Sequence, residues 1–148
     1  AISFVSWFMT SKPHKITSQV KYAPSGVDET AGILLQNKED EMASIILSLH
    51  AKQPKRGTIS FDKGYIEIFE YPRGDEAVIT YTETGEKEVI TAGNTEKALE
   101  YEIEDMEKAV LENFDMHLNF TKDVMDIMTF IRNEWGMYYP EEEGREIL

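Results

Sequence analysis

Three histidines are the side chains best suited to metal binding in this sequence. His14, His50 and His117 lie far apart, and none belongs to an H-x-x-x-H or H-E-x-x-H pattern, which would place two imidazoles on one helical face. The chain has no cysteine, which excludes disulfides, thiolate metal sites and cysteine nucleophiles. We therefore expect histidines that lie on the surface or at element ends, and we assign no metal-binding residue.

Carboxylates are the most abundant candidates for general acid–base chemistry. They crowd residues 100–107 and recur at 141–143. A catalytic pair needs two carboxyl groups in contrasting environments, whereas most of these acids lie outside the apolar stripe of their segment. We expect solvated faces in both places. The sequence also lacks a G-x-S-x-G elbow and a phosphate-binding glycine loop, so we assign no catalytic residue.

The charge balance limits the classes of partner. The formal net charge is -13, with 15 Lys and Arg against 28 Asp and Glu. Nucleic-acid binding needs clustered positive charge, which is absent here. No apolar run is long enough to span a bilayer. With 148 residues, of which 41% are hydrophobic, the chain is expected to form a single domain over residues 1–148, and we expect a cytoplasmic location.

Alternating polar and apolar residues predict seven strands, separated by glycine-containing or charged turns. The clearest turn signals are Pro24-Ser25-Gly26, Asp62-Lys63-Gly64 and Glu83-Thr84-Gly85-Glu86. The expected strands cover residues 15–22, 30–36, 42–49, 57–61, 65–69, 77–82 and 87–91.

The remaining segments have helical periodicity. Residues 1–9 read as the end of a buried helix. Asn94 or Thr95 can cap a helix that runs to about Glu112, and a last helix begins near Thr121, which serves as its cap in preference to a glycosylation site at Asn119. The expected apolar stripes contain Leu99, Ile103, Met106 and Val110 in one helix and Val124, Ile127, Met128, Ile131 and Trp135 in the other. We expect Met106, Met125 and Met128 to pack in the core rather than line a peptide groove.

Strands followed by helices indicate an α+β fold. Residues 30–36 and 42–49 carry apolar side chains on both faces of the expected sheet. A second copy of the chain is the simplest cover for the face that the helices leave open, and a sheet that curls on itself is the alternative.

The order of the segments resembles the C-terminal half of the Gfo/Idh/MocA oxidoreductases, especially the branch similar to dimeric dihydrodiol dehydrogenase. The segments are GVDETA at 26–31, GTISF at 57–61, KGYIEI at 63–68, ALEYEIEDM at 98–106, VMDIM at 124–128, IRNEWG at 131–136 and YPE at 139–141. The implied fold is an open, predominantly antiparallel (mixed) sheet with helices packed on one face, like the C-terminal domain of glucose-fructose oxidoreductase.

The resemblance implies that the catalytic and cofactor-binding residues precede Ala1. Family members carry an N-terminal Rossmann domain that binds NAD or NADP, and a Glu-Lys-Pro motif there supplies the catalytic lysine. Ser11-Lys12-Pro13 falls where the family has a loop and does not match that motif. This chain has no G-x-G-x-x-G fingerprint, so we assign no cofactor-binding residue to it.

The implied function is the substrate-binding and dimerisation domain of an NAD(P)-dependent oxidoreductase (EC 1.1.1-like or 1.3.1-like). It would act on a sugar, a polyol or a related hydroxylated small molecule, and it would be inactive without the Rossmann domain. Trp135 is then either a core residue or, with Tyr138-Tyr139-Pro140, part of the substrate wall. The alternatives are a non-enzymatic dimeric interaction module and a small-molecule sensor domain.

Overall fold

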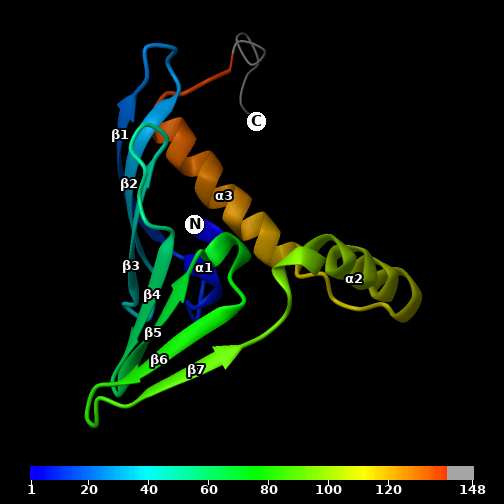
Figure 1. The fold of residues 1–148 in the computed structure, drawn as a ribbon. Coiled ribbons are helices and arrows are strands. Elements are labelled where there is room, and N and C mark those ends of the chain that lie inside the picture. The colour runs from blue at the N-terminus through cyan, green and yellow to red at the C-terminus, as the bar shows by residue number, and fades with distance from the viewer. Residues whose placement is uncertain (140–148) are drawn as a thin grey trace. The chain divides into compact units, whose positions relative to one another are not determined.

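The computed structural model describes residues 1–139 and divides into two compact units. One unit, here called the three-stranded unit, comprises residues 2–52 and 119–139 of the described chain. The other, the four-stranded unit, comprises residues 53–118 and Ala1. Figure 1 gives the element labels used below.

The three-stranded unit is an antiparallel sheet with helices on one face. The strands β1 (Lys15–Tyr22), β2 (Asp28–Gln36) and β3 (Met42–Ser48) lie in that order, and the register pairs Thr17 with Leu34 and Gly32 with Ile46. The helices are α1 (Ile2–Trp7) and α3 (Leu118–Glu134), and α3 lies along the sheet (Figure 1).

The core of this unit forms where α3 meets the inward-facing residues of the sheet. Alternation along β2 and β3 directs one set of side chains inward, and the helical repeat presents every third or fourth residue of α3 to them. The buried cluster consists of Ile33, Leu35, Ile45, Ile127 and Ile131, with Ile2, Val5, Ile16, Ala43 and Trp135 packed against it.

A buried asparagine holds the turn between β2 and β3. Asn37 is fully buried, and its side-chain oxygen accepts hydrogen bonds from the backbone N–H groups of Glu41 at 2.9 Å and Glu39 at 3.2 Å. Its amide nitrogen donates to the Glu41 carboxylate. The turn therefore satisfies a polar side chain that would otherwise be costly to bury.

The four-stranded unit is an antiparallel meander followed by a helix. Its strands are β4 (Arg56–Phe61), β5 (Gly64–Phe69), β6 (Glu76–Tyr81) and β7 (Lys87–Thr91). Two short 3-10 helices, η1 (Tyr71–Arg73) and η2 (Thr95–Lys97), and the helix α2 (Ala98–Glu112) complete the unit. Gly64 begins β5 in close contact with β6, and a Cβ atom there would lie 2.2 Å from the Thr80 carbonyl oxygen.

The predicted α+β class, the seven strands and the open antiparallel arrangement are confirmed. The strand bounds agree with the predicted ones to within two residues. The strands form two sheets rather than one of seven strands, and every strand pair in the described part of the chain is antiparallel, so the mixed character is not observed.

Several predictions about the helices were wrong. Helix α1 contains no fully buried residue. Helix α3 begins at Leu118, so Thr121 lies in its first turn and does not cap it. The three methionines assigned to the core are exposed, by 58% for Met106, 53% for Met125 and 47% for Met128. The acidic run at 141–143 lies outside the described residues.

Candidate functional site

The histidines lie apart on exposed positions and do not form a site. His14 precedes β1, His50 follows β3, and His117 lies in the loop before α3, where its imidazole is 3.6 Å from the Asp115 carboxylate. Among residues 1–139, no group of histidine, aspartate or glutamate side chains is arranged to hold a metal ion. The geometry thus offers no metal centre in this part of the chain.

Lys12 forms a structural ion pair with α3. Its ammonium group donates to Asp123 at 2.7 Å and to Asp126 at 2.8 Å. These hydrogen bonds raise the pKa of Lys12, and the Lys12 ammonium lowers the pKa of Asp126. A lysine that acts as a general base needs a depressed pKa instead. Ser11-Lys12-Pro13 lies in the loop between α1 and β1, as predicted.

The carboxylates of α2 form a solvated face. The glutamates at 100, 102, 104 and 107 are exposed. Two acids make exposed pairs within the helix region, Glu100 with Lys97 at 3.3 Å and Asp105 with Lys108 at 3.5 Å. The solvated face predicted for this segment is therefore observed.

The C-terminal end of α3 brings polar and aromatic groups together. Trp135 is half-buried against the core, and its indole N–H donates to the Ser18 hydroxyl at 2.9 Å. The Tyr22 hydroxyl donates to the Trp135 carbonyl oxygen. The helix stops at Gly136, whose positive φ of 60° allows the Met137 N–H to reach the Arg132 carbonyl oxygen at 3.1 Å.

Exposed aromatic rings surround this point. Tyr22, Tyr138 and Tyr139 are between 44% and 48% exposed, and the Arg132 guanidinium lies 5.6 Å from the centre of the Tyr139 ring. We call Tyr22, Arg132, Trp135, Tyr138 and Tyr139 the aromatic end of α3. Tyrosine rings offer both apolar faces and hydroxyl groups, and a guanidinium can bind a carboxylate or a phosphate.

The sequence predicted part of this arrangement. Trp135 and Tyr138-Tyr139-Pro140 were candidates for a substrate wall, and Trp135 was also a candidate for the core. The structure packs Trp135 against the core and leaves Tyr138 and Tyr139 exposed, while Pro140 lies outside the described residues. Ser18 and Tyr22 were missed as partners of Trp135, because alternation places them on one face of β1 but gives no information about residues more than 110 positions away.

The described residues do not fit a dinucleotide. Binding of NAD or NADP in a doubly wound fold uses a parallel βαβ unit with a glycine-rich turn at the helix N-terminus. Both sheets here are antiparallel. The link from β7 to η2 contains Ala92, Gly93 and Asn94, a single glycine. We therefore derive no chemical step through a nicotinamide from this chain's own residues.

Comparison with known proteins identifies a structural neighbour but no sequence relative. No family model matches the chain, and no curated protein matches it by sequence. Two crystal forms of UDP-N-acetylglucosamine 3-dehydrogenase from Acidithiobacillus ferrooxidans match the structure, with TM-scores of 0.71 and 0.72 and 14% sequence identity. Each match covers 86% of this chain and 42% of the dehydrogenase.

At this level of identity the match establishes the fold. The neighbour is a Gfo/Idh/MocA dehydrogenase matched over its C-terminal portion, so the resemblance predicted from the sequence is confirmed for the fold. The chain spans less than half the length of the dehydrogenase that it matches.

Proposed function

We propose that the chain is the C-terminal, substrate-binding and dimerisation domain of an NAD(P)-dependent oxidoreductase of the Gfo/Idh/MocA type. The observation that carries the proposal is the fold shared with the C-terminal portion of a sugar-nucleotide dehydrogenase. In this proposal a separate Rossmann domain binds the nicotinamide and supplies the catalytic residues, and this chain positions the substrate.

The aromatic end of α3 is the proposed substrate wall. Its tyrosine rings can pack against a sugar. A sugar or sugar nucleotide combines a hydroxylated ring with, in the nucleotide, phosphate groups. We therefore propose a hydroxylated carbohydrate substrate, with UDP-N-acetylglucosamine as the first compound to test because the structural neighbour is named for it.

The test compares this chain with the complete polypeptide encoded by its open reading frame. The complete polypeptide should transfer hydride between a carbohydrate and NAD or NADP, measured by the absorbance of the reduced nicotinamide. The 148-residue chain should bind neither cofactor in calorimetry. Micromolar binding of either cofactor to the chain alone, or a complete polypeptide without a Rossmann domain, would contradict the proposal.

Two tyrosine variants test the substrate wall separately. In the complete polypeptide, Tyr138→Ala and Tyr139→Ala should raise KM roughly tenfold, because each removes an exposed ring that would contact the substrate. The melting temperature should not change. Tyr101→Ala, which removes a similarly exposed ring from α2, is the matched control. An unchanged KM in both aromatic-end variants would place the substrate elsewhere.

We also propose that the open face of the three-stranded unit forms a twofold homodimer. Leu34, Met42 and Ile46 lie on the face opposite the buried cluster and are 42%, 62% and 61% exposed. The polar residues Thr17 and Gln19 border them on the β1 side, and Gln36 and Ser44 are polar residues of the same face on β2 and β3. An apolar centre with a polar rim is the composition expected of a self-associating surface.

Sedimentation velocity tests the dimer. Leu34→Lys with Ile46→Lys should convert a dimer into a monomer, because a twofold interface would bring four lysines together in its apolar centre. Leu111→Lys on α2, at a side chain that is 72% exposed, is the control and should leave the dimer intact. A wild-type chain that remains monomeric at high concentration would exclude this interface.

A further inference from the structure

Helix α2 carries an apolar seam that its own unit leaves uncovered. The seam consists of Leu99, Ile103, Met106 and Val110, which are between 58% and 75% exposed. No residue of α2 is buried, and Figure 1 shows the helix lying away from the strands of the four-stranded unit. Side chains at these positions should face a partner, because a stable amphipathic helix normally buries its stripe.

The spacing of the seam is compatible with a helical partner. The four residues follow one another at intervals of four, three and four, which is the alternation of the two core positions in a heptad repeat. This spacing places all four side chains in one narrow stripe along the helix. A second helix can pack along a stripe of this kind.

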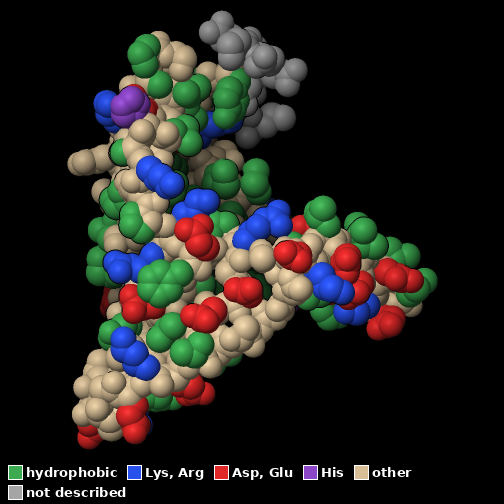
Figure 2. Space-filling model, in the orientation of Figure 1, with side chains coloured by type: hydrophobic (Ala, Val, Ile, Leu, Met, Phe, Trp, Pro, Cys, Tyr) green, Lys and Arg blue, Asp and Glu red, His purple; other side chains and the backbone are tan. Residues whose placement is uncertain are grey.

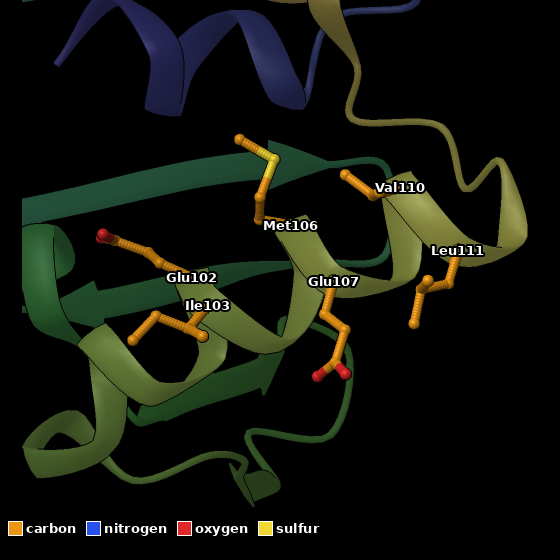
Figure 3. A pocket seen from close by; sticks show the side chains of 6 residues that line it. All are labelled: Glu102, Ile103, Met106, Glu107, Val110 and Leu111. Atoms are coloured by element: carbon orange, nitrogen blue, oxygen red, sulfur yellow. The ribbon is translucent and has the colours of Figure 1, made fainter.

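Glutamates border the seam on both sides. An open groove on α2 is lined by Ile103, Met106 and Val110, with Glu102 at one edge and Glu107 and Leu111 at the other. Figure 3 shows Met106 and Val110 extending from one side of the helix and Glu107 and Leu111 from the other. Glu100 occupies a second flanking position. In paired helices, the charges at these flanking positions select the partner.

We infer that α2 binds an amphipathic helix whose seam is apolar and whose flanking positions carry lysine or arginine. Helix α2 contains six acidic residues and one lysine, and acidic side chains stand beside the apolar ones over the helix (Figure 2). Opposite charges at the flanks would attract the partner and fix its register.

The same charges disfavour two other occupants. A second copy of α2 would set glutamate against glutamate in either orientation, because every charged flanking position is acidic. A bilayer with anionic lipids would repel the helix, since helices that lie on such membranes are basic. The inference does not depend on the dehydrogenase function proposed above.

The experiment measures binding of two synthetic peptides to the 148-residue chain. Both are helices of roughly 21 residues with isoleucine and leucine along the seam, and they differ only in carrying lysine or glutamate at the flanking positions. We expect the lysine peptide to bind at least about tenfold more tightly than the glutamate peptide. Equal binding, or no binding of the lysine peptide, would overturn the inference.

Two double variants distinguish the contribution of the apolar seam to peptide binding from that of the flanking charges. Ile103→Ala with Met106→Ala keeps the net charge and the helix propensity, and it should reduce binding of the lysine peptide by more than tenfold. Glu102→Lys with Glu107→Lys keeps the seam and should reverse the preference between the peptides. If the alanine variant binds the lysine peptide as tightly as the wild type does, binding depends on net charge alone and the seam is not the binding surface.

Other occupants give distinct results in the same variants. A second copy would appear as a dimer in sedimentation that the alanine variant dissociates. A membrane would appear as binding to vesicles of phosphatidylcholine and phosphatidylserine. If another part of the same chain packs on the seam, the alanine variant without peptide should have a lower melting temperature than the wild type. Each of these outcomes would overturn the inference, which expects an unchanged melting temperature and no binding to vesicles.

Discussion

Helices α2 and α3 have similar patterns and opposite environments. Both are amphipathic, with lengths of 15 and 17 residues. Helix α3 buries Val124, Ile127 and Ile131, whereas α2 buries no residue. All seven buried hydrophobic residues of the described chain lie in the three-stranded unit. An apolar stripe therefore indicates that a helix needs a partner but does not identify where that partner lies.

The largest predicted difference between the helices is in stability. Ile127 is 1% exposed and contacts the buried cluster. Ile127→Ala should lower the free energy of unfolding by about 3 kcal/mol, because it loses buried apolar surface and leaves a cavity. The same change at Ile103 in α2, which is 69% exposed, should cost less than about 0.5 kcal/mol. Urea denaturation of both variants measures the two values.

The two stability losses show whether the apolar seam of α2 is exposed to solvent or packs against another part of the chain in solution. Equal losses of stability in the two variants would mean that α2 packs within the free chain. A loss at Ile127 alone would show that the two helices differ in environment as the structure describes. Circular dichroism of the folded variants provides the control that neither helix is lost, since alanine favours helix at both positions.

The same contrast explains what the sequence could predict. All seven strands were predicted to within two residues, because alternation and turn residues such as Asp62 and Lys63 are local signals. The division into two sheets and the exposure of Met106 and Met128 were not predicted. Periodicity places both methionines on or beside the apolar stripes, but which stripe is covered depends on contacts between distant residues.

The candidate site was predicted less completely than the fold. Spacing placed Trp135 on the apolar stripe of its helix, and a family resemblance made Trp135 and the following tyrosines candidates for a substrate wall. The partners of Trp135 on β1, Ser18 and Tyr22, depend on the register of α3 along the sheet. No local pattern encodes that register, so these contacts could be identified only from the structure.

In the four-stranded unit, the backbones of β5 and β6 approach each other closely at Gly64. A Cβ atom at Gly64 would lie 2.2 Å from the Thr80 carbonyl oxygen, and backbone atoms cannot rotate away as a side chain can. Gly64→Ala should therefore cost about 2 to 3 kcal/mol, as overpacking does elsewhere. Gly32→Ala is the control in the other sheet, where the new Cβ would contact only the Ile46 side chain at 3.4 Å. Similar melting temperatures for the two variants would show that β5 and β6 can separate at this point.

The smallest predicted effect concerns the charges that join α3 to the loop after α1. Lys12 pairs with Asp123 and Asp126, whereas among residues 1–139 the ion pairs of α2 connect it only to residues within or next to the helix. Hydrogen bonds from the Lys12 ammonium lower the pKa of Asp126 below its ordinary value of 3.8. The stabilisation by Asp126 is therefore present above pH 3.8 and is lost as the pH falls through the folded-state pKa. The pKa of Lys12 is raised above 10.5, so its contribution is complete below pH 10.5 and is lost as the pH rises through the folded-state pKa.

Lys12→Met should lower the melting temperature at pH 7 by less than Gly64→Ala does, because Lys12, Asp123 and Asp126 are all exposed to solvent. The difference from the wild type should shrink as the pH falls below 3.8, and it should also shrink in high salt. Lys15→Met, at a lysine that donates to the neutral Gln36 side chain, is the control and should show neither dependence. Wild-type and Lys12→Met curves that stay parallel from pH 7 to pH 3 would mean that the pair does not hold α3 in place.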